Sequence, residues 1–159
     1  MSSDNKNSAY KMIAQNKKAR HSYHIEEEFE AGIVLHGSEV KSLRMAEANV
    51  ADSYAEVKNG EMFLINAYIK EYDQANRFNH ASRRVRKLLL HRKEISKMFA
   101  AVKRKGMTIV TLKLYFDDNN RAKVKLGLAK GKKLHDKRAA DKDRDWKREQ
   151  GRLLKRDNQ

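Results

Sequence analysis

The sequence contains no cysteine, and this absence excludes several kinds of chemistry at once. Without thiols the chain forms no disulfide, no thiolate metal site and no cysteine nucleophile, and the composition suits a reducing cytosol. Proline is also absent, so the turns must be formed by Gly, Asn, Asp or Ser. We therefore expect a cytoplasmic protein that is held together by non-covalent packing alone.

Long apolar stretches are the second feature that the sequence lacks. The apolar runs are short, such as residues 88–90, whereas a helix that spans a bilayer needs about 20 apolar residues. The first residues also lack the apolar core of a signal peptide. Neither a membrane span nor a secretory leader is expected.

Positive charge is what the sequence has in excess. Among 159 residues, 36 Lys and Arg stand against 21 Asp and Glu, which gives a formal net charge of +15. Such an excess indicates a polyanionic partner, RNA or DNA, with an anionic membrane surface and simple solubility as alternatives. The length allows one core-bearing domain with extensions, and we expect a monomer.

Alternating apolar and polar residues predict that the body of the chain is mainly β. Residues 23–35 alternate with a break at Glu27, which indicates a bulge or an edge. Asn59-Gly60 fits the type I′ turn of a hairpin within residues 54–69. Residues 110–128 alternate on both sides of an Asp-Asp-Asn-Asn turn and predict a second hairpin.

Two segments have helical spacing. A short helix is expected over 39–44, with Gly37-Ser38 supplying the turn and the N-cap. A longer helix is expected around 95–102 within 88–105, ending at Gly106. The predicted fold is mainly β with flanking helices, an OB-like antiparallel β-barrel over 16–130, although the strand number alone leaves another small barrel open.

Both ends of the chain are predicted to lie outside this body. Residues 1–15 are expected to be a flexible N-terminal extension. In the basic tail, 131–159, the apolar residues are too sparse to dock on the body, so we predict a tail that is disordered when free and helical on a surface. Its candidate contacts are Trp146, Leu153 and Leu154.

A basic block between 77 and 105 is the first candidate site. It mixes cations with Phe78 and 88–90 and holds a single acid, Glu94, which is typical of a surface that follows phosphates and contacts unpaired bases. A solvated loop and helix face is the alternative. The cations are Arg77, Arg83, Arg84, Arg86, Lys87, Arg92, Lys93, Lys97, Lys103, Arg104 and Lys105.

Three further patterns are weaker. Glu26, Glu28 and Glu30 with His24 allow the hypothesis of a metal-dependent nuclease, but no matching acids elsewhere complete a two-metal set, and an exposed strand face explains them more simply. His135 could stack on a base or simply be a solvated histidine of the tail. The glycines in 127–133 lack the spacing of a phosphate loop.

A series of short motifs runs through nearly the whole chain after Gln15. The motifs are 16–21 (NKKARH), 25–33 (IEEEFEAGI), 37–44 (GSEVKSLR), 48–49, 52–54, 76–80 (NRFNH), 86–90 (RKLLL) and 127–138 (GLAKGKKLHDKR). In this order they resemble the small protein B family (SmpB), the SsrA-binding proteins of bacteria. One departure is Ser82, because many family members have a proline in the loop before the RKLLL motif.

The resemblance implies an OB-like barrel that binds the tRNA-like domain of transfer-messenger RNA (tmRNA, or SsrA RNA). It implies an adaptor without a cofactor, not an enzyme. The adaptor would present the RNA to alanyl-tRNA synthetase and elongation factor Tu, and would then carry it to the A site of a stalled ribosome for trans-translation. The tail would lie as a helix in the vacant mRNA channel.

The resemblance also implies roles for particular residues. Asn16, Glu30 and Leu89 correspond to family residues of the RNA-binding surface, and His135 to one that faces small-subunit rRNA. The expected contacts with the tRNA-like domain are Asn16, Lys17, Lys18, Arg20, His21, Glu30, Arg77, Arg86, Lys87 and Leu89. The expected contacts with the decoding centre are Gly131, Lys132, Lys133, His135, Asp136, Lys137 and Arg138.

Overall fold

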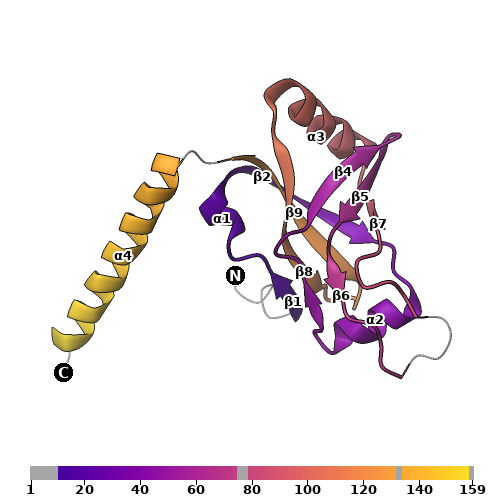
Figure 1. Ribbon diagram of the computed structural model, residues 1–159, viewed down its shortest axis with the longest axis horizontal. Helices are drawn as coiled ribbons and strands as arrows, with labels where there is room; N and C mark the ends of the chain where they lie inside the picture. Colours follow the sequence, from indigo (N-terminus) through magenta and orange to yellow (C-terminus); the bar gives the residue numbers. More distant parts are fainter. Residues whose placement is uncertain (1–10, 75–78, 132–133, 158–159) are drawn as a thin grey trace, which may run out of the picture.

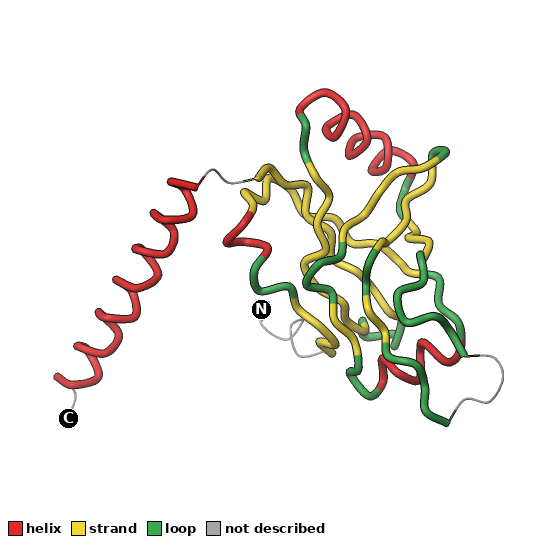
Figure 2. The backbone as a smooth tube through the Cα atoms, viewed as in Figure 1, coloured by secondary structure: helices red, strands yellow, loops and turns green. Residues whose placement is uncertain are grey.

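The structure is a computed structural model that describes residues 11–74, 79–131 and 134–157. Figures 1 and 2 show strands gathered into one body, with a long helix standing apart from it. The strands are β1 (Lys11–Gln15), β2 (Tyr23–Ile33), β3 (Ala48–Asn49), β4 (Tyr54–Lys58), β5 (Glu61–Ile65), β6 (Tyr68–Ile69), β7 (Arg86–Leu89), β8 (Thr108–Phe116) and β9 (Ala122–Gly131). The helices are α1 (Ala19–Ser22), α2 (Gly37–Arg44), α3 (Arg92–Lys105) and α4 (Leu134–Asp157).

The main sheet closes into a ring. Its strand order is β1-β8-β4-β5-β7-β2-β9, and β8 also pairs with β9, so the strands from β8 round to β9 form a closed circuit of antiparallel pairs. β1 lies on the same edge of β8 as β4, further along the strand. Closure removes most unpaired strand edges. The predicted mainly β fold with flanking helices is confirmed.

The predicted hairpin and bulge are both present. The register of β2 against β9 shifts between Ile25 and Glu27, as the break in alternation predicted. Asn59 and Gly60 have φ angles of 54° and 76°, so both central residues of the β4–β5 turn adopt the left-handed region that a type I′ turn requires. The second hairpin, β8–β9, also pairs as expected.

A main core fills the ring and extends under the helices that cover its ends, and a second, smaller cluster joins Ala19 of α1 to Val110, Leu112 and Ala129. In Figure 1, α3 lies near the top of the strands and α2 near the bottom. Leu43 of α2 and Met98 of α3 are fully buried against interior residues of the strands such as Leu64, Leu88 and Leu126. Each such side chain contributes about 1.5–3 kcal/mol through removal from water.

The predicted end of α3 is confirmed, whereas the predicted start of α2 differs from the structure. Gly106 ends α3 with a φ of 63°, as predicted. Ser38 is not the N-cap of α2, because the helix already begins at Gly37 and His36 is the N-cap. The Glu39 carboxylate accepts the His36 N–H at 2.8 Å, which is the bond that the N3 residue makes in a capping box.

Several predicted boundaries were wrong. The expected flexible extension 1–15 includes β1, since Ile13 is buried in the core and the strand pairs with β8; residues 1–10 lie outside the described residues. Residues 88 and 89, which were included in the helical stretch 88–105, belong instead to the strand β7, which begins at Arg86. The predicted strand 62–69 is broken at Asn66, whose φ of 64° ends β5 before β6.

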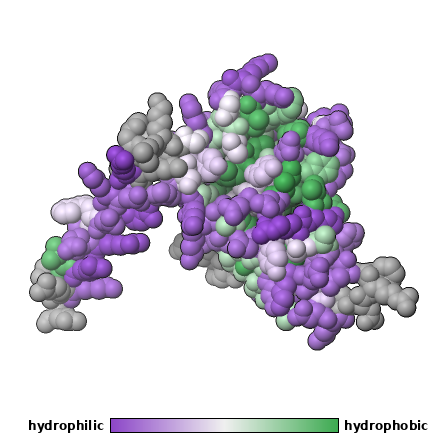
Figure 3. Space-filling model, in the orientation of Figure 1, coloured by the Kyte–Doolittle hydropathy of each residue, from purple (hydrophilic) through white to green (hydrophobic). Residues whose placement is uncertain are grey.

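The tail is a single helix, α4, that points away from the ring (Figure 1). It contacts α1, where His21 Nε2 lies 2.9 Å from Asp141 Oδ1. Trp146, Leu153 and Leu154 are exposed, and charged side chains dominate its surface in Figure 3. No helix within the described residues is both long and apolar enough to cross a membrane. Disorder of the free tail stays a prediction.

Candidate RNA-binding interface

The outer face of the sheet brings together residues from four neighbouring strands. Side chains on one face of a sheet recur every second residue, and the register pairs Gly32 with Leu89 and Lys123, and Glu30 with Lys125. The next pairings add residues of β8 beside β9. We call this surface the outer patch; it consists of Glu30, Gly32, Lys87, Leu89, Lys113, Tyr115, Lys123 and Lys125.

A tyrosine fixes the carboxylate at the centre of the outer patch. The Tyr115 hydroxyl reaches from β8 across β9 and donates a hydrogen bond to Glu30 Oε2. Tyr115 is only 5% exposed, whereas Glu30 is exposed. The carboxylate is therefore held in place at the surface, where its second oxygen is able to accept a hydrogen bond from a base amino group or a ribose hydroxyl.

An apolar groove lies beside this carboxylate. Leu89 is 53% exposed and lies across Gly32, where an added Cβ would stand 3.3 Å from Leu89 Cβ. Gly32 therefore leaves the room that Leu89 occupies. The groove has a volume of about 400 Å³ and a basic rim that includes Arg121 and Lys123. An apolar floor with a basic rim suits the sugar and base edges of RNA rather than a bare phosphate.

The charge of the outer patch is positive. Lys87 is paired with Glu61, Nζ to Oε1 at 2.9 Å. Lys113, Lys123 and Lys125 make no ion pair within the described ranges, and they stand against the single carboxylate of Glu30. Uncompensated lysines at a surface attract phosphates and release their counterions when they bind.

A second group of predicted residues lies at α1, beside the start of the tail. Lys17, Lys18 and Arg20 are exposed, and Arg20 pairs with Glu28. Tyr23, just after α1, pairs in register with Gly131, the last residue of β9. The strand β9 thus runs from the outer patch to the junction with α4.

Asn16 is mostly buried and serves the fold. It is 8% exposed, and its Nδ2 donates to the carbonyls of Ala51 and Thr111 at 3.0 Å each. These bonds join the chain before α1 to β8 and to the turn after β3. Its Oδ1 is buried and has no partner within the described part of the chain.

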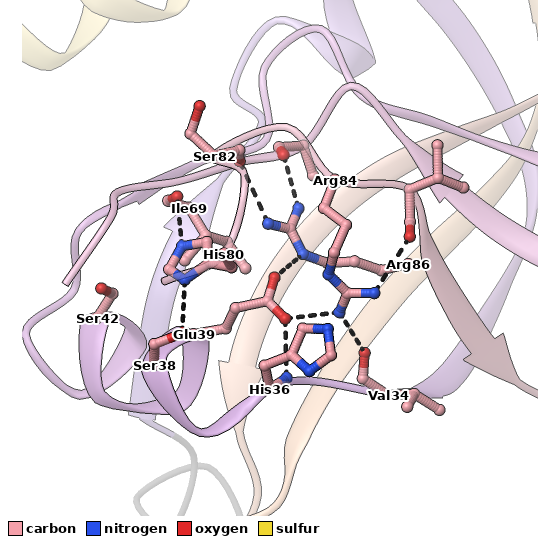
Figure 4. A network of polar contacts seen from close by, with 12 residues as sticks. Val34, His36, Ser38, Glu39, Ser42, Ile69, His80, Ser82, Arg84 and Arg86 are labelled. Carbon is pink, nitrogen blue, oxygen red and sulfur yellow. Dashed lines mark hydrogen bonds and ion pairs between the residues drawn. The ribbon is translucent and has the colours of Figure 1, made fainter. Parts of the chain in front are cut away.

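Arg86 is buried and does not lie on the outer patch, whereas the sequence predicted it among the contacts with the tRNA-like domain. The alternation of β7 turns Lys87 and Leu89 outward and Arg86 and Leu88 inward, and Arg86 is 0% exposed. Its Nε donates to Glu39, and its Nη1 donates to the carbonyl of Ala67 at 2.8 Å (Figure 4). A buried guanidinium is stable only with such partners.

Glu39 is the counter-charge of two arginines. Arg84 Nη2 donates to Glu39 Oε1 at 2.6 Å, and Arg86 bonds to the other oxygen (Figure 4). Burial by itself raises the pKa of the Glu39 carboxyl, but hydrogen bonds from Arg84, the His36 amide and Arg86 outweigh burial and lower it. Burial likewise lowers the pKa of Arg86, against the opposing effect of Glu39. The group is therefore an ionised network inside the fold.

The rest of the basic block is dispersed rather than shared by one surface. Arg83 bonds to Asn66 and lies over the Tyr68 ring. Lys97 of α3 pairs with Glu27, and the other α3 cations are exposed at the end of the ring. Arg77 lies outside the described residues.

The decoding-centre candidates lie at the junction and at the start of α4. Gly131 ends β9, and His135, Asp136, Lys137 and Arg138 belong to the first turns of the helix. Lys132 and Lys133 lie outside the described residues. No group of three or more His, Asp or Glu side chains suited to a metal occurs in the part that the structure describes, and Glu28 of the nuclease hypothesis is paired with Arg20.

Sequence reasoning missed Tyr115, Gly32 and Lys113. None of them stands in a motif that signals RNA contact, and they join the patch only through the pairing of β8 with β9 and of β2 with β7. Lys123 and Lys125 lie in the alternating stretch 110–128, but nothing in that pattern places them beside Glu30.

Comparison with known proteins identifies one family. The family model described as "SmpB protein" matches residues 13–156. A protein of Nitrobacter hamburgensis named SsrA-binding protein is 60% identical over 147 residues, which is 92% of this chain and 94% of that protein. One of the same name from Beijerinckia indica is 59% identical over 151 residues, 94% of this chain and 96% of that protein.

A solved structure is also similar to this chain. It is described as "tmRNA-SmpB: a journey to the center of the bacterial ribosome", with a TM-score of 0.63 and 48% identity over 76% of this chain and 84% of that chain. The family model, the curated relatives and the solved structure all match most of the chain, and the chain therefore belongs to the SmpB family.

Proposed function

We propose that this chain is an RNA-binding adaptor that binds the tRNA-like domain of tmRNA and delivers it to the A site of stalled ribosomes. The outer patch carries the proposal, since it combines an anchored carboxylate, an exposed leucine and uncompensated lysines on one face. The names of the relatives support the choice of RNA, because they are called SsrA-binding proteins. The solved relative is described with tmRNA and the bacterial ribosome.

The body and the tail have separate roles, because β9 connects the outer patch with the start of the tail. The body, which extends from β1 to Gly131, holds the tRNA-like domain through the outer patch and the exposed cations of α1. The tail, beginning after Gly131, enters the mRNA channel, with His135, Asp136, Lys137 and Arg138 at the decoding centre. A channel without mRNA exposes rRNA phosphates to a basic helix, whereas a filled channel excludes it. That difference in free energy lets the tail detect stalling.

The same proposal extends to the partners. The chain acts in the cytoplasm as a monomer without catalysis of its own. It presents the RNA to alanyl-tRNA synthetase and then to elongation factor Tu. Incubation of labelled RNA with the protein and Mg²⁺ gives no cleavage if this is correct, and the nuclease hypothesis predicts the opposite result.

Specific binding of the tRNA-like domain is the first test. Its affinity, measured by fluorescence anisotropy at one salt concentration, should clearly exceed the affinity for an ordinary tRNA. Glu30→Ala and Leu89→Ala should each weaken binding by about tenfold, because each loses a contact of about 1.4 kcal/mol. Met45→Ala, which shortens another exposed apolar side chain, should change nothing. Equal affinities for both RNAs would instead identify a general RNA-binding protein.

The conformation of the free tail is a second test. In the free protein, amide hydrogen exchange should be fast from about residue 137 onward. Most helical stability in proteins comes from the packing of an apolar face, whereas Trp146, Leu153 and Leu154 of α4 are exposed. Slow exchange throughout α4 would contradict the proposed tail that becomes ordered on the ribosome.

A further inference from the structure

Three side chains of α2 point into the segment that connects β6 with β7, residues 70–85. Ser42 Oγ donates to the carbonyl of Lys70 at 2.7 Å. Ser38 Oγ lies 2.9 Å from His80 Nδ1, and Glu39 binds the two arginines described above. Figure 4 shows all three on the same side of the helix, facing the segment. Together they fasten one helix to both ends of a long connection.

The base of this segment is closed by further bonds. His80 Nε2 lies 3.0 Å from the carbonyl of Ile69, and the Ile69 N–H donates to the carbonyl of Ser82 at 2.9 Å. The Asn79 side chain both accepts from the Tyr72 N–H at 3.1 Å and donates to its carbonyl at 2.9 Å. The chain that leaves β6 and the chain that enters β7 are therefore held side by side.

Arg86 connects this base to β7 itself. Its Nη1 and Nη2 donate to the carbonyls of Ala67 and Ser82 at 2.8 Å and 3.2 Å, while Nε holds Glu39. One planar guanidinium thus bonds to the loop after β5, to the end of the long segment and to α2. Lysine has a single ammonium group and cannot reproduce this fork.

The register of β7 decides which side chains reach the outer patch. β7 has only four residues, and it pairs with β2 through Gly32–Leu89 and Ile33–Leu88. A slip by one residue moves every side chain of a strand to the other face. Lys87 and Leu89 would then leave the outer patch, and Arg86 would be driven out of its network.

We propose that Glu39 and Arg86 are positioning residues for RNA binding: the buried network with α2 fixes the register of β7 and so presents Lys87 and Leu89 to the RNA, which neither residue touches. This inference rests on the proposed function for its readout. A surface cation would contact an RNA phosphate, whereas Arg86 acts through β7 without contacting the RNA. The two roles predict different effects of an Arg86 substitution on the salt dependence of RNA binding.

The main test compares Glu39→Gln and Arg86→Lys with Lys125→Gln, all in the full-length protein. Affinity for the tRNA-like domain is measured from 50 to 300 mM salt, at temperatures where circular dichroism shows each variant folded. Arg86→Lys and Glu39→Gln should weaken binding about tenfold, and the slope of log K against log salt should stay the same, because Arg86 contacts no phosphate and Lys87 is already neutralised by Glu61. Lys125→Gln removes a phosphate contact, so its slope should become shallower by about 0.7–0.9.

Thiol labelling measures the register of β7 directly. The chain has no cysteine of its own, so only an introduced cysteine is labelled. In the otherwise unchanged protein Leu89→Cys should label quickly and Leu88→Cys slowly, since Leu88 is 1% exposed. Adding Glu39→Gln should raise the labelling rate at 88 relative to that at 89. A loss of global stability alone raises the rate at 88 only in proportion to the unfolded fraction, which circular dichroism measures independently.

A milder variant keeps the inference testable if the charged variants do not fold. Ser42→Ala removes only the bond to the Lys70 carbonyl and should weaken RNA binding about threefold; Ser96→Ala, an exposed serine of α3, is its control. Folded variants that bind like the unchanged protein would overturn the inference, as would a shallower salt slope for Arg86→Lys. If the unchanged protein does not bind the tRNA-like domain, the proposed function fails instead.

Discussion

Glu39→Ala should lower the free energy of unfolding by about 3–5 kcal/mol, because it breaks a buried ion pair and leaves charge behind. Arg86 is 0% exposed and would keep its guanidinium without the carboxylate that neutralises it. Arg84 would lose the same partner. The α2 N-terminus would lose its cap at His36 as well. Urea denaturation followed by circular dichroism measures the change.

Two controls distinguish the effect of the lost charge on stability from the other effects of Glu39→Ala. Glu56→Ala removes an exposed acid of β4 and should change stability by about 0.5 kcal/mol at most. The double variant Glu39→Met, Arg86→Met should be more stable than Glu39→Ala, since the fully buried guanidinium of Arg86 is no longer left unpaired, while Arg84 loses its partner in both variants. A Glu39→Ala protein as stable as Glu56→Ala would show that the network adds nothing to the fold.

The same network gives stability a pH dependence of known sign. The pKa of Glu39 is lowered in the folded state, so its ionised form favours folding at pH values above the ordinary glutamate pKa of about 4.3. This contribution is lost as the pH falls below that value and through the folded pKa. The stability difference between the unchanged protein and Glu39→Ala should therefore shrink below about pH 4.

Deletion of residues 132–159 should abolish peptide tagging on stalled ribosomes and leave binding of the tRNA-like domain within about threefold at 150 mM salt. Gly131 is retained because it is the last residue of β9 and pairs with Tyr23. The outer patch contains no residue of the deleted segment. At this salt the Debye length is about 8 Å, so the lost tail charge contributes little to binding elsewhere.

The deletion is interpreted together with a second variant, which damages RNA binding and leaves the tail intact. Leu89→Ala should impair RNA binding, and tagging should recover at higher protein concentration because its tail is intact. The truncated protein should not recover at any concentration. Tagging by the truncated protein would contradict the proposed role of the tail.

Local patterns in the sequence predicted the elements whose structure depends on neighbouring residues. Alternation predicted β2 and both hairpins, the Asn59-Gly60 pair predicted its turn, and Gly106 predicted the end of α3. Glu30 and Leu89 were predicted from the family resemblance, and both lie on the outer patch. Their standing as RNA contacts stays a prediction until the binding measurements are made.

The errors have a common physical cause, which is pairing between distant parts of the chain. β1 has only five residues, and its three apolar residues are consecutive rather than alternating, so the strand is not recognised until β8 supplies its partner. Arg86 reads as one more cation in a basic block, and only Glu39, 47 residues earlier in the chain, explains its burial. Nothing in the sequence around Tyr115 predicts its contact with Glu30, 85 residues earlier, because that contact depends on the pairing of β8 with β9 and of β9 with β2.

The strand β9 fixes the distance between the outer patch and the start of the tail. Lys125, beside Glu30 on the outer patch, and Gly131, where the body ends, lie on one continuous strand, and six residues of strand span about 20 Å. The sheet holds this strand on both edges, by β2 and by β8. The distance between a bound RNA and the root of the tail is therefore set by the backbone, so that lengthening β9 by two residues would displace the tail by about 7 Å.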